Sequence, residues 1–209
     1  VELERVHRFS NDWEAAASLR LRQGEPDVLA VYQRHGRVIP GSLDDHLDMI
    51  GRAWVEAHTA GRALAITTTT NEHATLINHH IQQTRRHHGA LTGRPAAAAD
   101  GDVYVGDVVM TRRNDRTLTT TTGDTVRNRD RWTVTATHDD GSITARAQAS
   151  EATVTLPATY VSEFVQLAYA TTEHGNQGIT TDRSITLLTG TTTGRGLYVG
   201  ATRGRVDNQ

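Results

Sequence analysis

The stretch Ala63-Leu64-Ala65-Ile66-Thr67-Thr68-Thr69-Thr70-Asn71-Glu72 decides the fold class of this chain. Its first four residues form a short apolar run, which predicts a buried β-strand. Thr69 and Glu72 have the spacing of a capping box, which predicts a helix that runs through Ile77 to Gly89. A strand followed directly by a capped helix is the repeating unit of a mostly parallel α/β sheet.

Three more helices are expected before this unit. The run Ser10-Asn11-Asp12 offers N-cap residues for a helix that Gly24 ends. Residues 26–36 predict a second helix, because proline suits the first turn and glycine the end. Ser42 and Asp45 form another capping box, and the apolar spacing after it predicts a helix up to residue 61.

After Arg94-Pro95 the chain becomes rich in Thr and Val, with turn signals between short alternating runs. Short strands at this spacing predict a small β-barrel. Strands of α/β type are expected again at 165–169 and 184–188, followed by a final helix. We therefore expect a parallel-sheet domain of residues 1–97 and 164–209, with a β-barrel of residues 99–163 inserted in it.

Composition narrows the class of protein. The chain has 209 residues, a net charge of -2, no cysteine and no lysine, so all 22 basic residues are arginine. Without cysteine there are no disulfides, which fits a reducing cytoplasm. No apolar run approaches the roughly 20 residues of a membrane span, so no membrane partner is expected. The neutral charge argues against a nucleic-acid coat, but a motor that holds one strand in a local groove is compatible with it.

Three segments carry the chemistry: Leu3-Glu4-Arg5-Val6-His7-Arg8-Phe9, Tyr169-Ala170-Thr171-Thr172-Glu173-His174-Gly175-Asn176-Gln177-Gly178-Ile179-Thr180 and Leu197-Tyr198-Val199-Gly200-Ala201-Thr202-Arg203-Gly204-Arg205. In this order they resemble motifs IV, V and VI of RecD-like superfamily 1 DNA helicases, especially conjugative relaxase-helicases of the TrwC/TraI type. The resemblance implies the second, C-terminal RecA-like motor domain, of the P-loop NTPase type, with an SH3-like β-barrel inserted between motifs IV and V.

The resemblance also implies roles for single residues. Arg203 and Arg8 match the two arginines that reach the γ-phosphate of ATP, a role that suits the planar, permanently charged guanidinium. Nucleotide contacts are further implied for Gln177, Gly178 and Arg205. The implied contacts with single-stranded DNA are Thr172, His174 and Thr180.

Each of these residues also has a structural interpretation. Arg203 and Arg205 could complement a helix dipole, and for Arg205 we favour a solvated charge at a helix end. His174 could cap a loop. The run Arg112-Arg113-Asn114-Asp115-Arg116 is a charged turn that either contacts DNA or is solvated.

The other conspicuous side chains are expected to be structural. For the histidine pairs at 79–80 and 87–88 we expect a solvated helix end and no metal site. The three tryptophans follow amphipathic patterns, so we expect core positions for Trp13, Trp54 and Trp132.

Three departures from the helicase pattern stand out. Gly175 is an additional glycine in motif V and predicts a looser loop. Gly194 and Gly196 each cost the final helix about 1 kcal/mol relative to alanine. The absence of lysine excludes the phosphate-binding loop motif, which requires one. ATP and Mg²⁺ are therefore expected only together with a separate ATP-binding RecA-like domain. An excised domain, a truncated product and half of a split enzyme all remain open.

Two other functions remain open beside the motor domain. One is a non-catalytic module that binds single-stranded DNA or a protein, and the other is a truncated, inactive remnant, which the glycines slightly favour.

Overall fold

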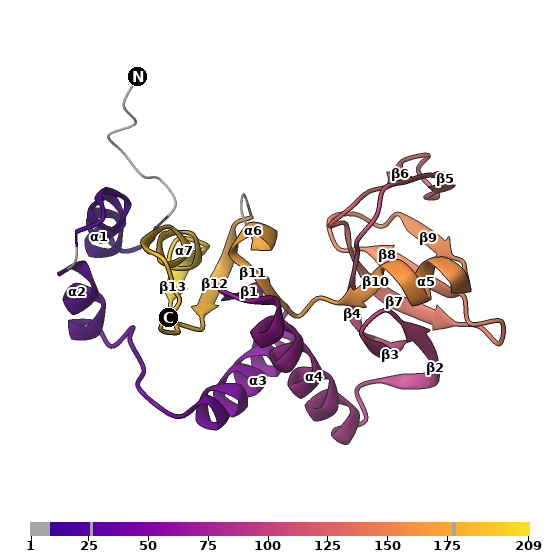
Figure 1. Cartoon of the computed structure of the whole chain (residues 1–209), viewed down its shortest axis with the longest axis horizontal. Helices are drawn as coiled ribbons and strands as arrows, with labels where there is room; N and C mark the ends of the chain where they lie inside the picture. Colours follow the sequence, from indigo (N-terminus) through magenta and orange to yellow (C-terminus); the bar gives the residue numbers. More distant parts are fainter. Residues whose placement is uncertain (1–8, 26, 177–178) are drawn as a thin grey trace. The chain divides into compact units, whose positions relative to one another are not determined.

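The computed structural model describes residues 9–25, 27–176 and 179–209. The chain forms two compact units. The first combines residues up to Ile77 with Ala170–Gln209, and the second is Asn78–Tyr169. Figure 1 labels the helices and strands of both units.

The first unit is built on a parallel sheet of four strands in the order β11-β1-β12-β13. The strands are β1 (Leu64–Thr68), β11 (Ala170–Thr172), β12 (Thr181–Thr186) and β13 (Gly204–Asn208). Ile66 pairs with Ala170 on one side and with Ile185 on the other. The prediction that Ile66 and Ile185 belong to one sheet is confirmed, although their strands are separated by the whole second unit.

The helices α1 (Asp12–Gln23), α2 (Val28–Arg34), α3 (Leu43–Thr59) and α4 (Asn71–His87) correspond to the four predicted ones. The capping box at α3 is confirmed, because Asp45 N donates to Ser42 Oγ at 3.2 Å and Ser42 N to Asp45 Oδ2 at 3.1 Å. The predicted box at α4 is wrong by one residue. His73 N donates to Thr70 Oγ1 at 3.2 Å, so Thr70 caps this helix.

The end of the chain differs from the prediction. The strand expected at 165–169 in the parallel sheet is corrected: β10 (Val165–Leu167) pairs antiparallel with a strand of the second unit, and the parallel strand β11 begins only at Ala170. The short helices α6 (Glu173–Asn176) and α7 (Gly194–Gly200) follow, and the chain continues after α7 into β13. The sequence Gly-Arg-Val-Asp-Asn of β13 is polar, so it lacks the apolar alternation by which a strand is recognised.

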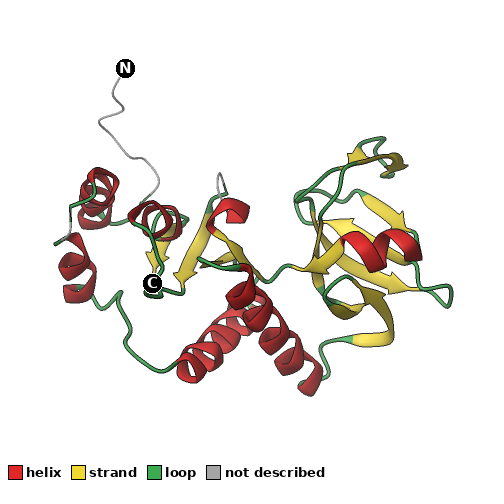
Figure 2. Ribbon diagram, viewed as in Figure 1, coloured by secondary structure: helices red, strands yellow, loops and turns green. Residues whose placement is uncertain are grey.

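The second unit contains an antiparallel sheet in the order β10-β4-β7-β8-β9 (Figure 2). Its further strands are β4 (Val108–Thr111), β7 (Arg131–Thr137), β8 (Ile143–Ala147) and β9 (Thr153–Leu156). Two ribbons, β2 (Thr92–Ala98) with β3 (Gly101–Val105) and β5 (Asp115–Thr119) with β6 (Thr125–Val126), and helix α5 (Ala158–Phe164) complete it. Strands β7 and β8 form a hairpin, with Gly141 in the turn at φ 81°.

The tryptophans lie largely where the amphipathic patterns predict. Trp132 and Trp54 are buried in the cores of the two units. Trp13 is half-buried, and its ring stacks on His35 with centroids 3.8 Å apart.

A buried polar cluster anchors the carboxyl-terminal half of α4 within the second unit. Gln82 Nε2 donates to Asp107 Oδ2 at 2.7 Å, Tyr169 donates its hydroxyl to the same carboxylate, and Arg85 Nη1 donates to the Tyr169 hydroxyl at 2.9 Å. Burial raises the pKa of both Asp107 and Tyr169. The cluster satisfies hydrogen-bonding groups that would otherwise destabilise the core.

Neither a membrane-spanning helix nor a metal cluster is found in the parts that the structure describes. No helix there combines the length and the apolar character needed to cross a bilayer. No three His, Asp or Glu side chains come together there as potential metal ligands.

Candidate functional site

Residues that border the motif IV and motif V segments contact the motif VI segment at the start of β13. Ser10, which directly follows the motif IV segment, donates its backbone amide to the carbonyl of Arg205 at 2.7 Å. Thr181, which directly follows the motif V segment, donates its amide to the carbonyl of Arg203 at 3.0 Å. Two residues far apart in the sequence, Ser10 and Thr181, thus contact the motif VI segment within residues 203–205.

Arg203 lies in the turn between α7 and β13, and only 6% of it is exposed. Its Nε donates to the carbonyl of Val199 at 2.8 Å, and Nη2 donates to Thr202 Oγ1 at 2.9 Å. Nη1 donates to the carbonyl of Ile179 at 3.3 Å. The guanidinium is therefore held directly against the end of the motif V segment.

The topology places this meeting point at the amino-terminal edge of the sheet. Because parallel sheets bind ligands at the carboxyl ends of their strands, the sequence predicts that Arg203 lies at that edge, near Gln177 and Gly178. Arg203 lies at the opposite edge instead, because Thr181 and Gly204 are the paired first residues of β12 and β13. The motif V segment leaves β11 at the carboxyl edge and enters β12 at the opposite one, so it spans both edges. Arg203 contacts its far end.

Three of the residues singled out from the sequence, Arg8, Gln177 and Gly178, lie outside the described residues. Their implied roles therefore stay predictions. Ser10 and Ile179, which lie close to them in the sequence, both contact the motif VI segment.

The residues expected to contact DNA lie along the motif V segment. Thr172 ends β11, is half-buried and pairs with Thr68 of β1. His174 follows in α6 with 65% of its side chain exposed, and its Nδ1 is 3.8 Å from Glu173 Oε1. Thr180 is exposed just before β12 begins. Thr172 and Thr180 thus lie at opposite edges of the sheet, with His174 in the helix between them.

Arg205 is exposed, but it is not at a helix end. It is the second residue of β13, so the predicted helix-end charge is corrected to a strand position. The sequence suggested a final helix that continues through this position, but a turn and a polar strand follow α7.

Asn176 anchors the motif V segment to the centre of the sheet. It is fully buried, and its Nδ2 donates to the carbonyl of Ile66 at 2.9 Å and to Thr67 Oγ1 at 2.8 Å. Beside it, Gly175 packs so closely on β11 that a Cβ would overlap the side chain of Thr171. The predicted looseness at Gly175 is therefore wrong, since the glycine permits a tight contact.

The glycines of α7 also serve close packing. A Cβ on Gly196 would overlap the Glu173 carboxylate, and a Cβ on Gly200 would overlap the Thr186 side chain. Gly194 differs, because a Cβ there meets no atom within 4 Å. Two of the three glycines thus let α7 approach α6 and β12, which alanine would prevent.

A buried polar cluster behind the Arg203 turn was not predicted. Asn208 Nδ2 donates to Glu14 Oε1 at 2.9 Å, and Ser184 Oγ donates to Asn208 Oδ1 at 2.7 Å. All three residues are almost completely buried. Glu14 lies in the first turn of an amphipathic helix, where an acidic residue usually signals a solvated end, so no local pattern could have identified its partner near the end of the chain.

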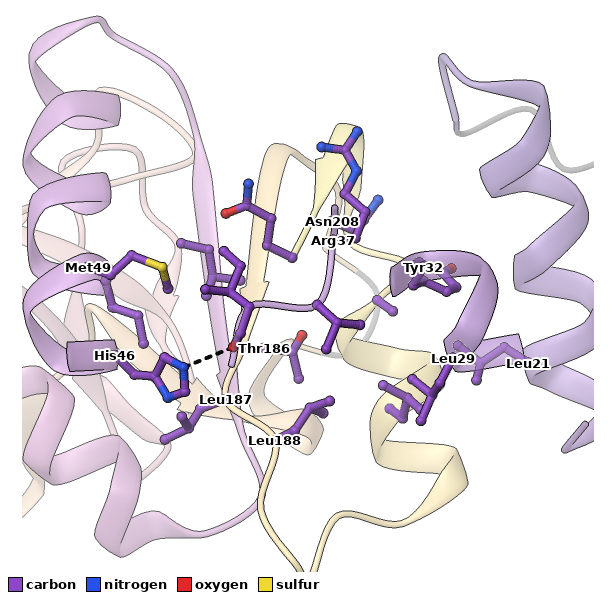
Figure 3. A pocket seen from close by; sticks show the side chains of 17 residues that line it. Leu21, Leu29, Tyr32, Arg37, His46, Met49, Thr186, Leu187, Leu188 and Asn208 are labelled. Carbon is purple, nitrogen blue, oxygen red and sulfur yellow. Dashed lines mark hydrogen bonds between the residues drawn. The ribbon is translucent and has the colours of Figure 1, made fainter. Parts of the chain in front are cut away.

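A cavity of about 160 Å³ lies at the carboxyl ends of β12 and β13 (Figure 3). Its walls are mainly apolar and include Met49, Leu187 and Leu188. His46 borders it, with Nε2 at 3.0 Å from the carbonyl of Ile39. The cavity is thus at the sheet edge opposite to the one where Arg203 lies.

Comparisons with known proteins agree with this architecture. The sequence model of the Rv2311 SH3-like barrel domain family matches residues 96–166, so the predicted inserted barrel is confirmed as SH3-like. No curated protein matches the chain.

Among solved structures, the Pif1 helicase from Bacteroides in complex with ADP-AlF3 and ssDNA aligns with 100% of this chain at a TM-score of 0.63 and 20% identity. The Bacteroides Pif1 structure bound to ssDNA gives 0.61 and 19%, again over 100% of this chain. Pif1 helicase from Candida albicans gives 0.58 and 13% over 99% of it.

The chain covers 52%, 51% and 55% of these three structures, about half of their length. At this identity the likeness establishes the fold. The chain has the same fold as about half of each of these Pif1 helicase structures, and residues 96–166 match an SH3-like barrel.

Proposed function

We propose that this chain is the second motor domain of an ATP-dependent superfamily 1 DNA helicase. A separate ATP-binding RecA-like domain, in the same parent chain or in a partner, supplies the phosphate-binding loop. The observation that carries the proposal is that Ser10 and Thr181, the residues directly after the motif IV and motif V segments, donate to the carbonyls of Arg205 and Arg203 in the motif VI segment. The parallel sheet then corresponds to a RecA-like sheet, and the Pif1-like fold supports that correspondence.

In this proposal Arg203 is the arginine finger, and Arg8 is the second arginine at the γ-phosphate. Phosphoryl transfer in such motors depends on positioning and on neutralising charge at the γ-phosphate, which a guanidinium from across the cleft can provide. Gln177, Gly178 and Arg205 would contribute further nucleotide contacts. ATP and Mg²⁺ would be bound chiefly by the other domain.

The proposed polynucleotide is single-stranded DNA. Both Bacteroides Pif1 structures contain ssDNA, one of them together with ADP-AlF3. For this chain we propose contacts from Thr172, His174 and Thr180, and the exposure of His174 and Thr180 supports this. A groove that holds one strand needs only local positive charge, which a chain of net charge -2 can supply.

Within superfamily 1, the sequences of motifs V and VI favour the RecD-like group and its conjugative relaxase-helicases. The structures that the fold matches are Pif1 helicases, so motif sequence and fold similarity point to different groups of helicases. The rest of the parent chain is therefore needed to assign the group. A relaxase domain encoded upstream supports the conjugative type, and its absence from the complete gene rejects that type.

The main alternative is a non-catalytic module that binds single-stranded DNA or a protein. An inactive remnant is less well supported, because Gly175, Gly196 and Gly200 fit tight contacts. A decayed sequence has no reason to keep glycine at the positions where a Cβ would overlap a neighbour.

The test is DNA-stimulated ATP turnover by the chain combined with the ATP-binding domain encoded beside it. Arg203→Ala should lower kcat by roughly 10³ or more, the scale of an arginine finger. KM should change less, because the finger acts mainly on developing charge. Arg203→Lys should restore only part of the rate, since lysine offers a point charge.

Arg195→Ala is the matched control, because Arg195 is an exposed arginine of the neighbouring helix α7. Thermal unfolding of each variant separates lost chemistry from lost folding. Full turnover by a folded Arg203→Ala variant would reject the finger. Tight binding of single-stranded DNA without turnover by the combined wild-type domains would favour the non-catalytic module.

A further inference from the structure

We propose that Glu14, Ser184 and Asn208 are positioning residues that hold the Arg203 turn and tie it to helix α1. The proposal rests on the proposed role of Arg203. It adds three residues that lie outside the helicase-like motif segments. Through the Glu14–Asn208 hydrogen bond, these residues also hold helix α1 against β13.

Asn208 clamps the residue that follows Arg203. Its Oδ1 accepts a hydrogen bond from Gly204 N at 2.8 Å, and its Nδ2 donates to Gly204 O at 3.0 Å. One side chain thus binds both backbone polar groups of a single residue. A carboxamide can do this because it carries a donor and an acceptor side by side.

Ser184 joins the clamp to the other end of the turn. Its hydroxyl lies 2.7 Å from Asn208 Oδ1 and 3.1 Å from the carbonyl of Gly200, the last residue of α7. The turn of residues 201–203 therefore has its start and its end bound to one cluster. Because Ser184 is in the central part of β12, the cluster fixes the turn to the sheet.

Gly204 leaves no room for an alternative arrangement. A Cβ there would overlap the carbonyl oxygen of Asp207, and it would be 2.9 Å from Ser184 N and 3.0 Å from Asn208 Oδ1. The backbone of this residue therefore sits directly against the clamp. Any larger residue would have to push the clamp away.

Glu14 connects the clamp to α1, the helix that follows the motif IV segment. Glu14 Oε1 accepts from Asn208 Nδ2 at 2.9 Å, and Oε2 is 3.4 Å from Asn11 Nδ2. Asn11 also donates to the carbonyl of Val206 at 3.2 Å. A fully buried carboxylate is costly unless it is hydrogen-bonded, and these partners satisfy it.

The consequence concerns the geometry of the two proposed arginines. Arg8 comes shortly before α1 and Arg203 shortly before β13, and the Glu14–Asn208 hydrogen bond joins these two elements, while α1 packs on α7 (Figure 1). A displacement of about 1 Å in a catalytic group can cost about 10²-fold in rate. The cluster is therefore placed to control how accurately Arg203 is presented.

The test follows the Nε–H of Arg203 by NMR in this chain alone, with its signal assigned by its loss in Arg203→Lys. This proton donates to Val199 O and should exchange slowly with solvent in the wild type. Glu14→Ala and Asn208→Ala should accelerate its exchange by about tenfold or more, the scale of one lost buried hydrogen bond. The backbone amide of Ile66 in the centre of the sheet should stay protected.

Ser18→Ala is the control, because Ser18 is similarly buried on α1 and its hydroxyl donates within its own helix, to Ala15 O. Unchanged Arg203 exchange in Glu14→Ala and Asn208→Ala overturns the proposal. Equal acceleration at Ile66 also overturns it, because that pattern shows general destabilisation.

A swap of donor and acceptor keeps the proposal testable if the alanine variants do not fold. Asn208→Asp places two carboxyl groups face to face and removes the donor to Gly204 O, so it should accelerate Arg203 exchange. Adding Glu14→Gln restores the donor–acceptor pair with α1 but not the bond to Gly204 O, so it should slow the exchange again in part. A double variant that exchanges as fast as Asn208→Asp counts against the proposal. In the combined motor the same variants should lower kcat more than they raise KM. If the NMR effects occur but kcat is unaffected, the role of Arg203 in turnover is rejected. The positioning of the Arg203 turn by Glu14, Ser184 and Asn208 is then still supported.

Discussion

The backbone amide of Ser10 donates to the carbonyl oxygen of Arg205 at 2.7 Å, which joins the segment before α1 to the second residue of β13. Neither residue has a partner nearby in sequence that would suggest this bond. It joins the residue directly after the motif IV segment to the motif VI segment by backbone pairing within the first unit.

The close packing of α7 can be tested with two glycines of the same helix. Gly200→Ala should destabilise the fold by about 1–3 kcal/mol, because the new methyl group overlaps Thr186. Gly194→Ala should be neutral or stabilise by up to about 1 kcal/mol, because its Cβ meets no atom within 4 Å and alanine favours the helix. Urea unfolding measures both. Equal effects would show that α7 is not packed as described.

Burial of Glu14 should make stability depend on pH. Desolvation raises the pKa of this carboxyl above its ordinary value of 4.5, although hydrogen bonds from Asn208 and Asn11 oppose the shift. Between 4.5 and the raised value the folded state binds more protons than the unfolded state, so the contribution of Glu14 to stability is lost as pH rises through that value.

Glu14→Gln removes the titrating group and keeps an acceptor for Asn208. The variant should therefore gain stability relative to the wild type as pH rises from about 4.5 towards neutrality. Urea midpoints of both proteins across this range measure the difference. A constant difference, or one that changes in the opposite direction, would contradict a raised pKa at Glu14.

The polar cluster of the second unit makes a separate prediction. Tyr169→Phe removes the hydroxyl that donates to Asp107 and accepts from Arg85. Because both partners are buried, the loss should destabilise the fold by about 1–3 kcal/mol. Tyr104→Phe is the control, since Tyr104 is half-buried and its ring would keep the contact with Arg86, whose Cζ lies 4.4 Å from the ring centroid. Urea unfolding should show a larger loss of stability for Tyr169→Phe than for Tyr104→Phe.

The chain by itself should neither bind ATP with useful affinity nor hydrolyse it. The reason is the absence of lysine, which leaves no phosphate-binding loop of the type that cradles the phosphates. Equilibrium binding of a fluorescent ATP analogue and release of phosphate are the measurements. Turnover by purified chain that survives Arg203→Ala would contradict this expectation, and turnover abolished by that change would reassign the nucleotide site to this chain.

The sequence by itself determined the local elements and their order. The apolar run at 63–66, the capping box at Ser42 and the Thr/Val-rich stretch predicted a strand, a helix and an inserted barrel, because each signal depends on residues within a few positions of one another. It also limited the nucleotide chemistry through the missing lysine. The motif segments identified Arg203 before its surroundings were known.

Only the tertiary structure decided where these elements meet. β13 is polar, and it joins the sheet because Asn208 and Asp207 have partners on α1 and β12 and in the segment before α3. The edge of the sheet at which Arg203 lies depends on the register between β12 and β13, which is set by pairing between segments far apart in the sequence. The fit of Gly200 against Thr186 depends on the same pairing. Such contacts are satisfied only when the whole unit has formed, so no window of the sequence could contain them.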